Sequence, residues 1–285
     1  MAVEAAEHKA AAAGGSEGST ATKQWNTHNI TGRLGADVTC AATAGGLVAP
    51  LIMTVDKCII ENASGKRTMT ESIKSSLSQL AFRPHRFFTS NSFLIIFLVY
   101  GGTYTCANVL DTWKSTSKNR IASSTTSGWS KFAATSTANM GLSLYKDSQF
   151  TKMFGTVSAR PIPPLSYALF MTRDALTIFA SFNLPALFAP KIPIPDDFAE
   201  KYISRASTAQ FMIPAAMQLV STPLHLLGLD LYNEGDANMR ERLKKIRMDY
   251  FKSSLARMAR IIPAFGVGGV VNTGMRKRLM IPLEQ

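Results

Sequence analysis

The stretch FFTSNSFLIIFLVYGGTYTCANVL, residues 87–110, holds no charged side chain along its whole length. A helix of this length can cross the hydrocarbon core of a bilayer, which needs about 20 apolar residues. A run without charge is uncommon in a soluble helix bundle, so this stretch predicts a membrane-spanning helix. Five weaker apolar stretches lie on either side of it. One precedes it, at about residues 36–60, and four follow it, at about residues 129–150, 165–188, 207–232 and 261–275.

The chain is basic and apolar at the same time. Its formal net charge is +12, its pI is about 9.8, and 46% of its residues are hydrophobic. The charges lie between the apolar blocks, which is typical of a membrane protein with basic loops. The basic residues are not interleaved with aromatic ones, which argues against nucleic acid as a partner. We therefore expect the lipid bilayer as the surroundings, with a soluble bundle of very apolar helices as the alternative.

No group of residues points to catalysis. Cys40, Cys58 and Cys106 are widely spaced, and no nucleophile–base pair, paired carboxylates or metal-ligand spacing is present in the sequence. The glycine run at residues 266–274 follows no predicted strand, so it favours helix packing over a dinucleotide loop. We expect neither an enzyme nor a metal or cofactor. Residues 1–30 are rich in Ala, Gly and Ser and predict a disordered tail.

The apolar stretches have an internal periodicity. Arg86, Arg160 and Arg260 each stand at the start of an even-numbered stretch. Asp56 precedes Arg86 by 30 residues, and Asp230 precedes Arg260 by the same 30 residues. Chance can place arginines at helix starts in a basic chain, but the shared offset favours a repeat. The pattern predicts three tandem helix pairs.

On these residues the chain resembles the mitochondrial carrier family. Arg260-Ile-Ile-Pro263 matches the start of that family's even helices, and Arg276 stands where a later basic residue would. Arg160 and Pro163 match in the second repeat, where Asp174 stands near the acidic position. Charged residues near the ends of the odd stretches look like remnants of the family's odd-helix motif: Asp56, Lys57, Lys146, Asp147 and Asp230. No intact copy of that motif is present.

The resemblance implies an all-α membrane protein with six transmembrane helices in three pseudo-symmetric helix-pair repeats. The repeats would cover residues 31–114, 129–190 and 205–282. It also implies a multi-pass protein of a mitochondrial membrane, most naturally the inner one, that exchanges a small anionic metabolite by alternating access. Because the motifs are degenerate, a non-transporting scaffold, insertion or fusion factor with the same fold is the alternative.

Two sets of residues are the candidates for such a site. Arg173 and Asp174 lie in mid-span, where ionisable groups are costly unless they face a cavity or pair with each other. We predict that an anion is bound by Arg86, Arg160, Arg173, Asp174, Arg260, Asn91 and Asn272. We predict that a salt-bridge network at the ends of the spans is formed by Asp56, Lys57, Lys146, Asp147, Asp230 and Arg276. The basic links between odd and even spans are a candidate surface for cardiolipin.

Overall fold

A computed structural model describes residues 25–123, 125, 129–156, 161–182, 184–193, 195, 205–234 and 237–284. The described part is all-helical and contains no strand. The helices are α2 (Ile30–Ala63), α3 (Met69–Phe82), α4 (Pro84–Phe88), α5 (Asn91–Ser117), α6 (Trp129–Phe154), α7 (Pro164–Phe182), α8 (Leu184–Phe188), α10 (Arg205–Asn233), α11 (Met239–Ala259) and α12 (Gly269–Met280). Single turns are η1 (Ala189–Lys191), η2 (Ile262–Gly268) and η3 (Ile281–Leu283).

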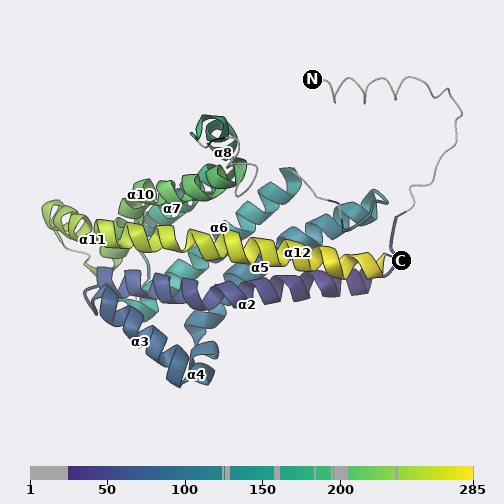
Figure 1. Cartoon of the computed structure of the whole chain (residues 1–285). Coiled ribbons are helices and arrows are strands. Elements are labelled where there is room, and N and C mark those ends of the chain that lie inside the picture. The colour runs from purple at the N-terminus through teal and green to yellow at the C-terminus, as the bar shows by residue number, and fades with distance from the viewer. Residues whose placement is uncertain are drawn as a thin grey trace, which may run out of the picture.

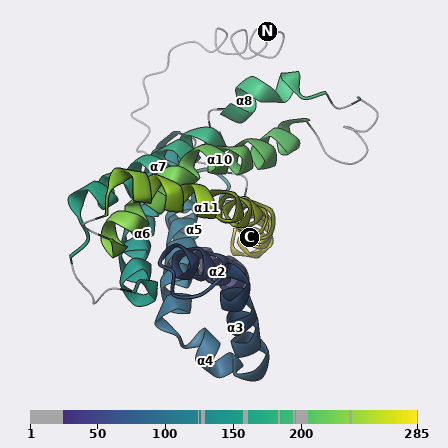
Figure 2. The same cartoon turned by 90° about the vertical axis from the view of Figure 1, so that its left-hand side faces the viewer.

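Long helices that follow one another in the chain also lie side by side. α2 packs against α5, α5 against α6, α6 against α7, and α7 against α10. α11, η2 and α12 continue one another as a single long rod, which lies along α2 (Figure 1). The rod also contacts α10, so the helices close into a bundle with α3 and α4 projecting at its edge (Figure 2).

Small residues allow the closest helix pair to form. A Cβ atom added to Gly45 of α2 would lie 2.8 Å from the backbone nitrogen of Gly101 in α5. The two backbones therefore touch, which is how membrane helices gain packing energy where lipid offers no hydrophobic driving force. Around this contact a buried apolar cluster joins five helices through Ile52, Ile96, Phe150, Phe170 and Leu229, among others.

Three helices are long and apolar enough to cross a membrane: Ile30–Ala63, Asn91–Ser117 and Phe211–Asn233. They correspond to the first, second and fifth predicted spans. The predicted third span, now α6, is rich in Ser, Thr and Lys, and α7 carries Arg173 and Asp174 at its middle. The last predicted span begins as η2 and ends in a basic turn of α12. The protein is a helical membrane protein, while six spans in three repeats stay a prediction.

The polar link after the first predicted span contains a short helix, α3. α3 begins with a capping box in which Thr68 and Glu71 exchange hydrogen bonds with each other's backbone. Its serines face the bundle, because Ser72 and Ser76 are fully buried and the Ser72 hydroxyl donates to Glu61 at 2.6 Å. Leu77 on its apolar side is half exposed. Leu80 packs against the apolar core, so the apolar side of α3 lies at the edge of the bundle, partly buried and partly exposed.

Candidate functional site

A line of alternating charges crosses the bundle. Arg260, at the end of α11, donates from Nη1 to Asp56 Oδ1 of α2 at 2.7 Å. The other oxygen of Asp56 accepts from Lys146 Nζ of α6 at 2.7 Å. Lys146 also lies 2.8 Å from Asp147 Oδ1. These contacts tie α11, α2 and α6 together, and the side chains are almost fully buried except for Arg260, of which 14% is exposed.

The line continues into α7. Asp147 Oδ2 accepts from Arg173 Nη2 at 2.5 Å, and Asp174 Oδ1 accepts from Arg173 Nη2 at 2.6 Å. Arg173 Nη1 lies 2.9 Å from His225 Nδ1 of α10. We call the six charged residues the ion chain: Arg260, Asp56, Lys146, Asp147, Arg173 and Asp174. It alternates in sign along its length, with three bases and three acids, so its formal charge is balanced.

The six charged side chains of the ion chain can be buried together because they pair with one another. A charged side chain inside a bilayer or a protein core is costly unless an opposite charge and hydrogen bonds compensate it. Each charge of the ion chain has an opposite neighbour on a different helix or on the adjacent residue. The charges that make α6 and α7 too polar for lipid are thus accommodated by each other.

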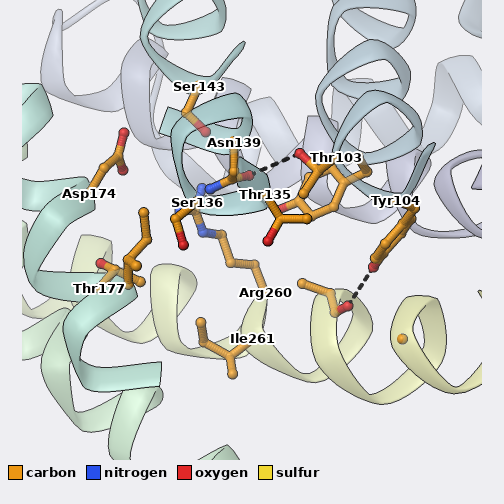
Figure 3. Close-up of a pocket in the computed structure, with 14 residues that line it drawn as sticks. Thr103, Tyr104, Thr135, Ser136, Asn139, Ser143, Asp174, Thr177, Arg260 and Ile261 are labelled. Atoms are coloured by element: carbon orange, nitrogen blue, oxygen red, sulfur yellow. Dashed lines mark hydrogen bonds between the residues drawn. The ribbon is translucent and has the colours of Figure 1, made fainter. Parts of the chain in front are cut away.

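A pocket of about 200 Å³ opens beside the ion chain (Figure 3). In Figure 3, Thr103 and Tyr104 of α5 form one side, Asp174 and Thr177 of α7 the other, and Arg260 points up between them. The part of the wall that comes from α6 is polar but uncharged: Thr135, Ser136, Asn139 and Ser143. Most of the remaining lining surface is apolar and includes Ile178, Ile261 and Ala264. The two ends of the ion chain, Asp174 and Arg260, therefore both line one pocket.

Two buried atoms in this pocket lack a hydrogen-bond partner among the described residues. They are Asp174 Oδ2 and the hydroxyl oxygen of Ser136. A buried acceptor without a donor costs about 1–3 kcal/mol, and more for a charged one. The neighbouring groups are occupied, since Thr103 donates to Asn139 at 3.4 Å and Tyr104 to the Ala264 carbonyl at 2.8 Å.

Irregular backbone borders the pocket on the rod side. η2 is a π-helical turn that begins directly after Arg260 and Ile261, with Pro263 as its second residue. The Tyr104 hydroxyl bonds to the Ala264 carbonyl in this turn, and a Cβ atom at Gly268 would collide with that hydroxyl. π-Helical turns inside longer helices are frequent at functional sites.

A second polar cluster lies at the other end of α2. Asp37 accepts from Arg276 of α12 at 2.7 Å and from Thr112 of α5 at 2.5 Å. Asn108 and Asn272 exchange amide hydrogen bonds at 2.8 and 2.9 Å. We call these five residues the clasp. Asp37 and Asp56 are 19 positions apart on one helix, or about 28 Å, close to the thickness of a bilayer core.

The structure brings together part of each predicted residue set. Arg173, Asp174 and Arg260 meet Asp56, Lys146 and Asp147 in the ion chain, so the two sets that we predicted separately form one cluster. That these residues bind a solute stays a prediction.

Other predicted residues lie elsewhere. Arg86 is exposed on α4, and Asn91 is exposed at the start of α5, so neither reaches the pocket. Asn272 and Arg276 belong to the clasp. Asp230 pairs with Arg242 of α11 at 2.6 Å, and Lys57 lies over the ring of Phe154. Arg160 lies outside the described residues.

The two predicted sets differ from the clusters in the structure because they assumed equivalent positions in three repeats. Side chains on one helix point around its full circumference, so equal spacing does not ensure a common direction. Sequence analysis also missed Asp37, Asn108 and the α6 wall of the pocket. A signal for that wall existed: residues 135, 136, 139 and 143 recur at helical spacing and form a polar stripe in an apolar stretch.

Comparison with known proteins identifies the family. No curated protein and no solved structure matches the chain. The sequence model of a family described as "probable citrulline exporter" matches residues 40–280. This match overturns the predicted membership of the mitochondrial carrier family, whose motifs the chain holds only in degenerate form. A mitochondrial location rested on that resemblance alone and stays a prediction. The chain belongs to the probable citrulline exporter family, a family of membrane exporters.

Proposed function

We propose that this protein exports citrulline through the pocket beside the ion chain. The observation that carries the proposal is the composition of that pocket. It places one carboxylate, Asp174, and one guanidinium, Arg260, among hydroxyl and amide groups. The description of the family supports the choice of citrulline, and the two opposite charges in a mainly apolar lining support a small zwitterion with an aliphatic chain.

The chemistry of citrulline fits this lining. At neutral pH the molecule carries one ammonium and one carboxylate group, and its ureido side chain is uncharged with both donors and acceptors. Arg260 and Asp174 can each meet one charge of the head group. Ser136 and Asn139 offer neutral hydrogen bonds to the ureido group.

Charge balance supports a neutral solute over the anion that the sequence suggested. The anion prediction required several unpaired arginines around one cavity. Arg173 is paired with Asp147 and Asp174, and Arg86 lies on the exterior. Each charge of the ion chain already has an opposite partner, and a zwitterion without net charge leaves that balance unaltered.

Efflux from reconstituted vesicles tests the proposal. Vesicles containing the purified protein are loaded with labelled citrulline, and loss of label is compared with protein-free vesicles. Labelled arginine and labelled succinate in parallel vesicles test a cationic and an anionic solute. We expect citrulline to leave faster than either. Succinate efflux without citrulline efflux would restore the anion prediction, and no efflux of any solute would favour the non-transporting scaffold.

A further inference from the structure

The ion chain has two ends, and both ends lie in the pocket. Its basic end is Arg260 and its acidic end is Asp174. We propose that the zwitterionic head of the substrate binds both ends of this chain, with its carboxylate on Arg260 and its ammonium on Asp174 Oδ2, and thereby releases the Asp56–Arg260 pair that links α2 to the middle of the rod. The inference rests on the proposed function and assigns the atoms and the movement that it would use.

The acidic end favours an ammonium group. Asp174 Oδ1 already accepts two hydrogen bonds from Arg173, at 3.0 Å from Nε and 2.6 Å from Nη2. Asp174 lines the pocket, and its Oδ2 has almost no accessible surface and no partner in the described part of the chain, so the carboxylate must turn slightly toward the cavity to accept from a ligand. An ionised carboxylate oxygen only accepts hydrogen bonds, so its partner must be a donor. A cationic donor gives the strongest such bond.

The basic end favours a carboxylate. The Arg260 guanidinium offers five N–H donors in a planar fork, of which the hydrogen bond to Asp56 uses one. In Figure 3 its side chain rises from the rod into the pocket toward the α6 wall. A guanidinium binds a carboxylate in a bidentate manner when two of its donors are accessible. The substrate carboxylate can therefore bind next to Asp56 and compete with it.

The substrate would weaken two ion pairs, Asp56–Arg260 and Arg173–Asp174. In each pair, the residue that does not bind the substrate keeps a second partner. Asp56 keeps Lys146 when Arg260 turns to the substrate, and Arg173 keeps Asp147 when Asp174 does. No charge is left alone, so the exchange avoids the large penalty of an unpaired buried ion.

Release of the Asp56–Arg260 pair would act on the contact between α2 and the rod. Arg260 is at the boundary of α11 and η2, and its bond to Asp56 joins the rod to α2. One turn earlier, Arg257 donates to Gln218 and Ser221 of α10 at 2.8 and 3.3 Å, which holds the rod to α10. Loss of the Arg260 contact thus loosens the middle of the rod from α2 while Arg257 keeps it on α10, and the Arg276–Asp37 and Asn62–Asp249 contacts still hold its two ends to α2. A ligand that binds the released state better shifts the equilibrium toward it.

Substrate analogues and one variant test the assignment. The vesicle assay measures how well three unlabelled compounds compete with labelled citrulline: citrulline, N-acetylcitrulline and citrulline amide. N-acetylcitrulline lacks the ammonium group, and citrulline amide lacks the carboxylate. We expect each analogue to compete at least about tenfold more weakly than citrulline, the loss of one charge-assisted hydrogen bond. Asp174→Asn keeps an acceptor for Arg173 but loses the charge. In this variant we expect competition by citrulline to weaken about tenfold and competition by N-acetylcitrulline to stay unchanged.

A matched control and a binding measurement separate the possible failures. Asp230→Asn makes the same change in a buried ion pair away from the pocket, and we expect it to leave the analogue pattern intact. Equal competition by all three compounds would overturn the inference while the proposed export of citrulline stands. If citrulline is not exported, melting of the purified protein is measured with glutamine and N-acetylglutamine. Stabilisation by glutamine alone retains the inference and rejects citrulline, and stabilisation by neither overturns both.

Discussion

The two polar clusters on α2 differ in how completely their hydrogen bonds are satisfied. In the clasp, all three guanidinium nitrogens of Arg276 donate hydrogen bonds, and both oxygens of Asp37 accept one. In the ion chain, Asp174 Oδ2 has no partner in the described residues, and a pocket adjoins it. A saturated cluster has nothing left to offer a ligand. The comparison separates a structural contact from a candidate binding site, although both contain an aspartate–arginine pair.

The largest expected effect on stability is at the clasp. Arg276→Ala leaves Asp37 buried without its cation, and the loss of one member of a buried pair costs about 3–5 kcal/mol. We expect a marked fall in the melting temperature of the purified protein or failure to accumulate in the membrane. Thermal melting in detergent measures it, with exposed Arg278→Ala from the same helix as the control. A melting temperature equal to that of the control would remove the clasp from the structural role.

Arg260→Ala is expected to act on export more than on folding. Asp56 keeps Lys146, so the variant inserts and folds, but the pocket loses its only guanidinium among the lining residues. Loss of a hydrogen bond to a charged group costs about 1.5–3 kcal/mol, or about ten- to hundredfold in efflux rate. Vesicle efflux and melting are measured together. An undiminished efflux rate would contradict a role of Arg260 in binding citrulline. A large fall in melting temperature would show that Arg260, like Arg276, has a structural role.

A smaller effect on stability and efflux is expected when a methyl group is added beside the π-helical turn η2. Gly268→Ala places a methyl group against the Tyr104 hydroxyl and Val48, and such overpacking costs about 1–3 kcal/mol. Gly274→Ala in α12 is the matched control, because nothing lies within 4 Å of its added Cβ atom and it does not line the pocket. We expect lower melting and weaker efflux for the first variant and neither for the second. Equal behaviour of the two variants would show that Tyr104 moves freely.

The smallest expected effect is at the hydroxyl of Ser136. Because this hydroxyl has no partner among the described residues, Ser136→Ala breaks no hydrogen bond and should leave melting unchanged. If the hydroxyl meets citrulline, the concentration for half-maximal efflux should rise by about two- to tenfold, equivalent to one neutral hydrogen bond. Exposed Thr137→Ala is the control on the same helix. Unchanged efflux in both variants would place the ureido group elsewhere.

Sequence analysis predicted the residues of the ion chain better than their arrangement. Arg173 and Asp174 were identified because charges in an apolar stretch require partners. Arg86 was chosen by its spacing from Asp56, but α4 turns it to the exterior, and Asp56 takes Arg260 from the opposite end of the chain instead. The three-repeat alignment could not reveal this, since spacing along a helix says nothing about its rotation in the bundle.

The sequence by itself determined that this is a helical membrane protein with buried charges. Apolar length, the absence of charge between residues 87 and 110, and the cost of an ion in lipid suffice for that conclusion. Only the tertiary structure decided which charges meet. Asp56 and Arg260 are 204 positions apart, and Asp37 and Arg276 are 239 positions apart. Such pairs depend on how the α11–α12 rod lies along α2, and that placement comes from packing contacts among all the helices, which no local pattern encodes.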